Sequence, residues 1–89
     1  MSADLIRFYE AWEIVPLPDG TREVADECGH LHDTLAEAKE HHKLSAGYNA
    51  IVGVEYLANG EQVVFAEHAW RAKRPRSGFA RIMWDMVNA

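Results

Sequence analysis

The most reactive side chains of the chain lie close together in its first half. Cys28, His30 and His32 are spaced at i, i+2 and i+4, so on an extended strand all three would point to the same side. His42 follows on a predicted helix and could supply a fourth ligand. Zinc binds four nitrogen or sulfur donors in a tetrahedron, so this set is a candidate zinc site.

A zinc site is nevertheless the less favoured interpretation of these residues. Their spacing matches no established zinc-finger pattern, and Gly29 interrupts the strand that a shared face would require. The favoured interpretation is that His30 and His32 are polar loop residues that precede a helix. We therefore expect no metal and no other cofactor.

Catalytic motifs are missing from the sequence. It contains no G-x-S-x-G elbow, P-loop, G-x-G-x-x-G or H-E-x-x-H pattern. Cys28 and His30 could form a thiolate pair, because a nearby imidazolium lowers the pKa of a thiol, but no third residue is placed to orient the base. The adjacent acids Asp26 and Glu27 would point to opposite faces of a strand. We expect no enzymatic activity.

Charge is divided unevenly along the chain. Residues 1–70 carry thirteen acidic and four basic side chains, a balance of −9, whereas residues 71–89 carry five basic and one acidic, a balance of +4. This division predicts an acidic domain over residues 1–70, followed by a basic linker and short helix over residues 71–89. Such a distribution bears on the choice of partner more than on the fold.

The acidic side chains are spread over a predicted turn, a strand and a helix. Carboxylates at such spacings could imitate nucleic-acid phosphates and occupy a basic cleft on another protein, although acidic surfaces also keep small domains soluble. The candidate partner-binding residues are Asp19, Glu23, Asp26, Glu27, Glu37 and Glu40.

Four basic side chains within six positions are candidate phosphate contacts, namely Arg71, Lys73, Arg74 and Arg76. Trp70 and Phe79 flank them and could stack on bases. The acidic domain, however, would repel the same polyanion at distances below the Debye length. The favoured alternative is that the tail associates with the acidic domain of its own chain or of a dimer mate.

Two predicted hairpins supply most of the framework that positions these groups. Residues 12–17 and 22–28 are joined by a turn with the sequence Pro-Asp-Gly. Residues 50–57 and 62–70 are joined by Asn-Gly, a strong type I′ hairpin signal. On the last strand, alternation predicts that Val64, Ala66, His68 and Trp70 share one face.

A helix is predicted between the hairpins. Thr34 and Glu37 match a capping box, and Leu35, Ala38 and His42 form one inward stripe. Gly47 is expected to end this helix in the left-handed conformation. The predicted fold class is therefore α+β, a small ββαββ domain in which two antiparallel hairpins surround one helix.

A short amphipathic helix is predicted near the C-terminus. A helix of this length is not stable alone in water, so it must pack on the acidic domain or on a partner. Its candidate partner or dimer contacts are Phe79, Ile82, Met83, Met86 and Trp84.

Size and composition favour a cytoplasmic domain that forms a homodimer. A chain of 89 residues has a thin core, so a second copy would help to bury apolar surface. Cys28 is the only cysteine, which suits a reducing compartment. The first residues lack the features of a signal peptide, and no apolar run approaches the roughly 20 residues of a membrane span.

The hairpin around Pro18-Asp19-Gly20, the helix start at Asp33 to Ala38 and the hairpin at Asn59-Gly60 resemble the small ββαββ domains of bacterial and phage proteins. That group includes antitoxin-like modules and short acidic phage inhibitors such as anti-CRISPR proteins. The resemblance covers residues 9–70 and implies a non-enzymatic binder of a protein with a basic surface. The alternative is an antitoxin-like or regulatory module that contacts nucleic acid through residues 71–76; no membrane contact is expected.

Overall fold

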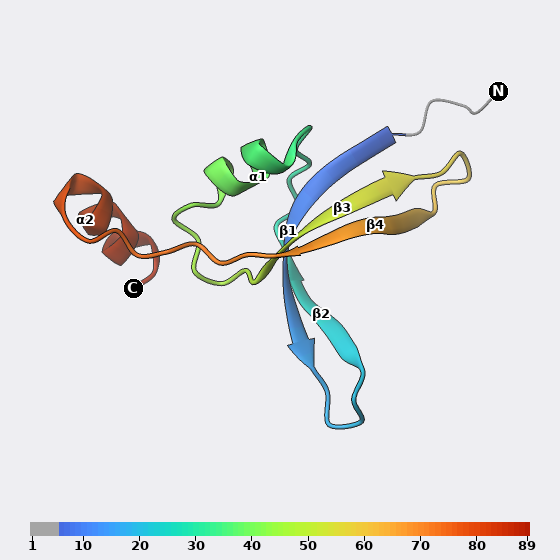
Figure 1. The fold of residues 1–89 in the computed structure, drawn as a ribbon, viewed down its shortest axis with the longest axis horizontal. Coiled ribbons are helices and arrows are strands. Elements are labelled where there is room, and N and C mark those ends of the chain that lie inside the picture. Colours follow the sequence, from blue (N-terminus) through green and yellow to red (C-terminus); the bar gives the residue numbers. More distant parts are fainter. Residues whose placement is uncertain (1–5) are drawn as a thin grey trace.

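The computed structural model describes residues 6–89, which form four strands and two helices (Figure 1). In chain order these elements are β1 (Ile6–Pro16), β2 (Arg22–Glu27), α1 (Leu35–His41), β3 (Ala50–Tyr56), β4 (Gln62–Ala69) and α2 (Gly78–Val87). The strands form one antiparallel sheet in the order β2-β1-β3-β4. The α+β class is confirmed, and the two hairpins join into one sheet through β1 and β3. Within the described residues, no helix is long and apolar enough to cross a bilayer.

β1 is almost twice as long as the strand predicted at residues 12–17. Its first part, from Ile6 to Trp12, pairs with β3, and its second part, from Trp12 to Pro16, pairs with β2. Only the second part carries a local hairpin signal, because its partner is the next strand along the chain. The structure of residues 1–10, left open by the sequence, is strand from Ile6 onward, while residues 1–5 lie outside the described residues.

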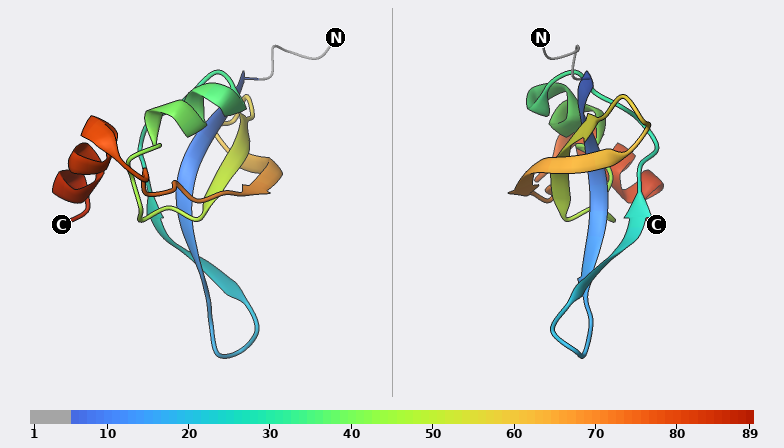
Figure 2. Two further views of the ribbon diagram at one scale, coloured as in Figure 1. Left: turned by 60° about the vertical axis from the view of Figure 1, so that its left-hand side comes forward. Right: turned by 90° about the vertical axis from the view of Figure 1, so that its right-hand side faces the viewer.

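The two parts of β1 run in different directions, each with its own hairpin partner, so the sheet is strongly curved. The β1–β2 hairpin extends away from the β3–β4 hairpin (Figure 1), and α1 covers one face of the sheet (Figure 2). Each face has its own small apolar cluster. One consists of Trp12, Ala50, Val52 and Val54, with Ile14 and Tyr56 packed against it. The other lies under α1 and centres on Ala11, Ala38 and Ile51.

α1 begins as predicted and ends earlier. The Thr34 hydroxyl accepts a hydrogen bond from the Glu37 backbone N–H at 3.1 Å, and the inward positions Ala38 and His42 are buried. After His41 the backbone continues in turns with i to i−3 hydrogen bonds, such as Ser45 N–H to His42 O. The expectation for Gly47 is wrong, because the four glycines with positive φ are at other positions.

The predicted face of β4 is also wrong, because one extra residue interrupts the alternation. Val54 pairs with Val64, but the preceding residue, Gly53, pairs with Ala66. The ring of Phe65, between the two, lies over Gly53, where a Cβ atom would come within 2.6 Å of the phenyl Cζ. As a result Val64 lies on the face of Trp12, whereas Trp70 packs on the cluster under α1.

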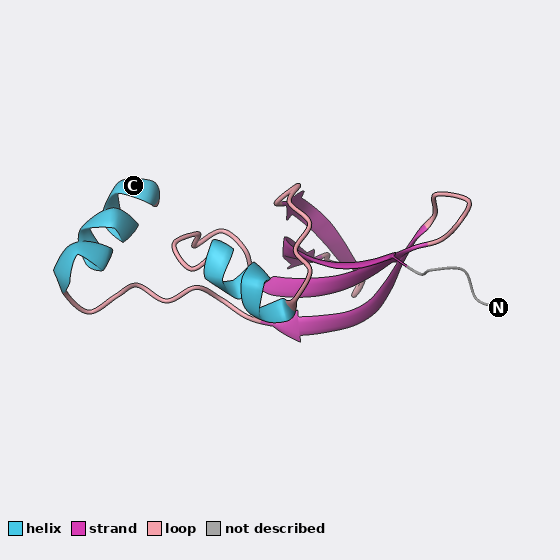
Figure 3. Ribbon diagram, turned by 90° about the horizontal axis from the view of Figure 1, so that it is seen from above, coloured by secondary structure: helices cyan, strands magenta, loops and turns pink. Residues whose placement is uncertain are grey.

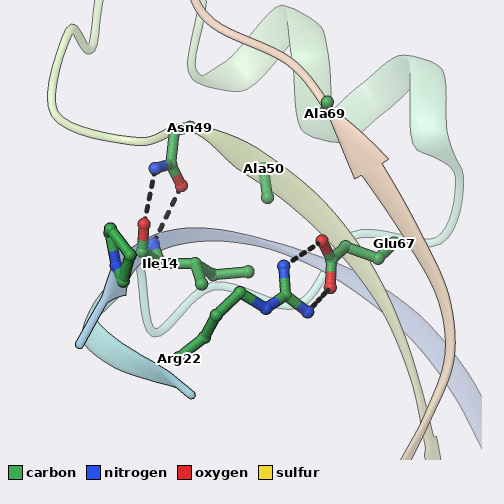
Figure 4. Close-up of a pocket in the computed structure, with 7 residues that line it drawn as sticks. Ile14, Arg22, Asn49, Ala50, Glu67 and Ala69 are labelled. Atoms are coloured by element: carbon green, nitrogen blue, oxygen red, sulfur yellow. Dashed lines mark hydrogen bonds and ion pairs between the residues drawn. The ribbon is translucent and has the colours of Figure 1, made fainter. Parts of the chain in front are cut away.

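Asn49 stabilises the point at which β1 leaves β3. The last β1–β3 pair is Trp12 with Ala50, so Ile14 has no partner on β3. The Asn49 side chain replaces that partner: its Oδ1 accepts from Ile14 N–H at 2.8 Å and its Nδ2 donates to Ile14 O at 2.7 Å (Figure 4). The Asn49 main chain also donates to Trp12 O and accepts from Trp70 N–H. One residue thus joins β1, β3 and the end of β4.

Asn49→Asp should destabilise the fold by about 1–3 kcal/mol, because a carboxylate cannot donate to Ile14 O and leaves that partly buried acceptor unpaired. Urea denaturation measures the change. Asn59→Asp is the matched control, since the Asn59 side chain only accepts, from Glu61 N–H at 2.9 Å, and a carboxylate accepts equally well. Equal stabilities of the two variants would show that the Asn49 amide is not needed.

Candidate functional site

α2 stands apart from the rest of the molecule (Figure 3). Among the described residues, no Cα atom of α2 lies within 8 Å of the sheet or of α1. The residue after the helix, Asn88, holds it to the loop that follows α1. The Asn88 amide donates to Leu44 O at 2.7 Å and accepts from Ala46 N–H at 2.9 Å. α2 is therefore positioned by its C-terminal end and leaves most of its surface free.

The predicted apolar stripe of α2 faces solvent. Large apolar side chains on this face are exposed by 55–73%, and they belong to Phe79, Ile82, Met86 and Val87. Met83, on the same face, is partly buried. Trp84 lies on another side of the helix and is only 9% exposed. Trp84 therefore helps to fix α2 on its own chain and is not offered to a partner.

Within residues 6–89, the basic segment forms no ion pair with the acidic domain. Arg74 forms a bidentate ion pair with Asp85 of α2, with distances of 2.9 and 2.8 Å. Hydrogen bonding to this guanidinium lowers the pKa of Asp85. Arg81 donates to the backbone oxygen of Arg76. The described salt bridges leave Arg71 and Lys73 without a carboxylate partner. Of the two forms of self-association expected from the sequence, pairing of the tail with carboxylates of its own acidic domain is thus not observed among the described residues.

The six acidic candidates are all exposed, but they fall into separate groups. Three of them, Glu23, Asp26 and Glu27, lie on β2, all of whose residues are exposed. Asp19 lies in the hairpin turn, where its carboxylate accepts from the Thr21 N–H and hydroxyl, which lowers its pKa.

The other two acidic candidates, Glu37 and Glu40, lie on α1, and Glu40 pairs with Lys43. Sequence reasoning missed Glu13, which lies directly opposite Asp26 in the β1–β2 ladder. Strand pairing supplies that neighbour, so spacing along the chain could not reveal it. The β1–β2 hairpin is consequently the most acidic part of the surface.

An ion pair links the two edge strands across the concave side of the sheet, which is the face opposite α1. Arg22 of β2 and Glu67 of β4 form two hydrogen bonds of 2.8 Å (Figure 4). Hollows of about 220 and 380 Å³ adjoin this pair and share Ile14 in their lining. The two residues are 45 positions apart, so no local pattern indicates their contact. Both are substantially exposed, and such pairs contribute little to stability.

Glu10 is the one buried acid among the described residues. Burial raises its pKa, the nearby charge of Glu27 raises it further, and the Trp12 indole partly offsets the shift. The Gln62 amide donates to Glu10 at 3.4 Å. A lone carboxylate of this kind is a possible general acid or base, but no nucleophile or second acid of the described chain lies hydrogen-bonded to it. We therefore assign it no catalytic role.

Three of the four candidate metal ligands come together in space. The ligand atoms of Cys28, His32 and His42 all lie within 4.8 Å of one another, and the Nε2 atoms of the two histidines are 3.3 Å apart. Cys28, His30 and His32 do not share one strand face, because Gly29 interrupts the strand as the sequence indicated: it has a positive φ of 74° and turns the chain between Cys28 and His30. His42 is brought to the group by α1.

His41, which sequence reasoning placed on the outer side of the helix, adjoins the same group. Its ring centroid is 4.8 Å from that of His32 and 4.7 Å from that of His42. His30 lies beyond it, 5.0 Å from His41. Burial and these neighbouring imidazoles lower the pKa of His42 to about 4, and burial also lowers that of His32. Four of the five histidines therefore form one cluster, which meets Cys28, the only cysteine, through His32 and His42.

Comparison of the chain with protein-family models, with curated proteins and with solved structures finds no match. The functional inferences below consequently rest on the geometry of the described residues.

Glu10→Gln should raise the free energy of unfolding at pH 7 by about 0.5–2 kcal/mol, the usual range of a single substitution, because it removes a buried charge. The pKa of Glu10 is raised in the folded state, so its charge is destabilising at neutral pH. That cost disappears as the pH falls through the folded pKa towards the unfolded value. The advantage of the variant should therefore vanish near pH 4.

Urea titrations from pH 4 to 8 provide the measurement for Glu10→Gln. Glu61→Gln serves as the control, because Glu61 is exposed in the β3–β4 turn and its substitution removes no buried charge. A stability gain that is independent of pH would contradict the assignment of the effect to the Glu10 charge.

Proposed function

We propose that this chain is a non-enzymatic protein-binding module that acts by stoichiometric association in the cytoplasm, and that α2 joins it to a second copy. The observation that carries the proposal is the exposed apolar face of α2, formed by Phe79, Ile82, Met86 and Val87. Apolar patches of this kind on a small domain mark contact surfaces, and an amphipathic helix is a common contact element.

The energetics of α2 support a contact role. The helix has ten residues, and a helix this short gains too little from its own hydrogen bonds to be stable in water. Removing apolar surface from water is worth about 25 cal/mol per Å². Contact with another protein surface would therefore supply the stabilisation that α2 does not obtain from the sheet.

Charge favours a second copy as the occupant of this face. The tail carries +4 and residues 1–70 carry −9, yet the described ion pairs of the tail stay within the tail. In a two-fold dimer the tail of each copy can face the acidic domain of the other, so that both contacts are made at once. Arg71 and Lys73 are exposed and available for them.

Ile82→Asp should weaken dimerisation at least tenfold, because it places a charge in the centre of the apolar face. Sedimentation equilibrium against the 10.1 kDa chain mass gives the dissociation constant. Arg81→Gln is the matched control, since Arg81 lies on the opposite side of α2, and circular dichroism checks that helix content is kept. A wild-type protein that stays monomeric at high concentration would refute the dimer.

The second part of the proposal concerns a protein partner with a basic surface. The β1–β2 hairpin projects from the sheet (Figure 1) and carries Glu23, Asp26 and Glu27 on its exposed strand. Glu13 lies opposite Asp26, and directly opposed like charges destabilise a sheet. A cationic partner would relieve this repulsion. In its sharpest form, the module is a phage- or mobile-element-type inhibitor whose carboxylates occupy a nucleic-acid-binding cleft.

Neutralising the hairpin with Glu23→Gln, Asp26→Asn and Glu27→Gln should remove most of the binding to a basic partner and flatten its salt dependence. A pull-down from bacterial lysate, split into nuclease-treated and untreated halves, measures this by mass spectrometry and by elution with salt. Glu61→Gln, in the β3–β4 turn, is the control for a carboxylate outside the hairpin. A partner that binds the triple variant equally, or independently of salt, would contradict phosphate mimicry.

Recovery of bound material only through nucleic acid would favour the alternative regulator function. Its motivating observation is that Arg71, Lys73 and Arg76 are exposed, whereas Arg74 is engaged by Asp85. Substituting the three exposed residues by alanine should then reduce binding about equally across sequences. Failure of the intact protein to shift any DNA or RNA at low salt would remove this alternative.

A further inference from the structure

The group formed by Cys28, His32 and His42 has the spacing of a metal site. Its ligand atoms lie within 4.8 Å of one another, and the two Nε2 atoms are 3.3 Å apart. Two nitrogens bound to one tetrahedral zinc ion at 2.0–2.1 Å are separated by about 3.3 Å. The two imidazoles therefore already have the separation that zinc requires, and only the sulfur needs to approach.

Each ligand is fixed by the backbone of a different segment. Cys28 N–H donates to Ala11 O at 2.9 Å. His32 forms an isolated bridge to Tyr9 of β1, with hydrogen bonds of 2.8 and 3.0 Å in the two directions. His42, at the end of α1, donates its N–H to Ala38 O and is 4% exposed. The positions of the three side chains are thus set before any metal binds, which lowers the entropic cost of binding.

The surroundings of the sulfur suit a thiolate. The Cys28 Sγ accepts hydrogen bonds from two backbone N–H groups, those of Ala11 at 3.3 Å and His30 at 3.4 Å. Such donors stabilise negative charge on a ligating sulfur and orient it. The thiol proton itself points to His30 O at 3.3 Å, and metal binding would release that proton to solvent.

The donor set selects the kind of metal. One thiolate with two imidazoles suits zinc, whereas calcium and magnesium require oxygen ligands. Zinc also requires imidazoles with a free ring nitrogen, and the Nε2 atoms of His32 and His42 lie 3.3 Å from each other. Three protein ligands leave a fourth tetrahedral position, and the His41 ring adjoins both histidines, with its centroid 4.8 Å from that of His32 and 4.7 Å from that of His42.

We propose that Cys28, His32 and His42 bind one zinc ion, with the fourth position directed towards His41. This site goes beyond the protein-binding function and does not depend on it. The ion would join the end of the β2 segment, the bridge to β1 and the end of α1. Because α1 has only seven residues and the core of an 89-residue chain is small, such a link would act as a structural staple.

The test uses the full chain prepared without a histidine tag. Titration of the metal-free protein with Co²⁺ should give one equivalent with a sulfur-to-cobalt charge-transfer band and the visible bands of a tetrahedral site, and Zn²⁺ should displace it. Zinc should also raise the midpoint of thermal unfolding, and a chelator should reverse the increase. Absence of the charge-transfer band, or binding well below one equivalent, would overturn the proposal.

Variants distinguish this site from chance binding by surface histidines. Cys28→Ser should abolish the charge-transfer band and lower zinc affinity by about 100-fold or more, because it removes the thiolate. His32→Ala should lower affinity to a similar degree, whereas His68→Ala, on β4 outside the group, should have no effect. Equal affinities of the Cys28 and His68 variants would overturn the assignment, even if a variant at the buried His42 failed to fold.

Discussion

The structure depends on a constraint placed on β1, which must pair with β3 along its first part and with β2 along its second part. Where it changes partner, the backbone of Ile14 would lose its hydrogen bonds on the β3 side. Buried backbone groups without hydrogen-bond partners are costly. The Asn49 side chain accepts from the Ile14 N–H and donates to the Ile14 carbonyl, so both backbone groups are paired. The divergence of the two hairpins, and hence the curvature of the sheet, follows from this single exchange of partners.

The curvature distributes a small number of apolar residues over two clusters. Neighbouring residues of β1 belong to different clusters. Trp12 is part of the cluster on the face opposite α1, and Ala11 is part of the cluster under α1. Neither cluster is large, and only Ile51, Val52 and Val54 are sizeable side chains that are fully buried. A core of this size leaves little apolar surface to hold α2. Among the described residues, the polar contacts of the helix end and of the helix itself are with the loop after α1 and with residues 74–76, and its apolar face is presented to solvent.

Features with local causes were predictable from the sequence. The hairpin at Asn59-Gly60, the Thr34 cap and the inward positions Ala38 and His42 are as expected, because turn chemistry, capping and periodicity act over a few residues. The predicted turn type is wrong, because a type I′ turn needs a positive φ at both central residues and only Gly60 has one. Features that depend on pairing between distant segments could not be predicted from the sequence. The start of β1, the extra residue at Phe65 and the Arg22–Glu67 pair arise only once the strands meet.

The same distinction applies to the candidate site. Spacing identified Cys28, His32 and His42 as candidate ligands and Gly29 as a break between Cys28 and His30. It did not reveal that Tyr9 pairs with His32, which fixes the position of His32 beside β1. His41 was missed because a periodic pattern assigns it to the outer side of α1, and only the position of the adjacent loop shows that it borders the group. The residue types therefore indicated a metal-binding chemistry. Pairing between distant segments determined which of these residues lie close together.

The cysteine–histidine group and α2 are physically linked through the loop that follows α1. His42 is the first residue of this loop, and its carbonyl accepts from Ser45 N–H. The neighbouring backbone groups of Leu44 and Ala46 bind the Asn88 side chain at the end of α2. Anything that restrains His42 thus restrains the loop that positions α2. Because no Cα atom of α2 lies within 8 Å of the described strands, the order of this loop determines how the apolar face of α2 is presented.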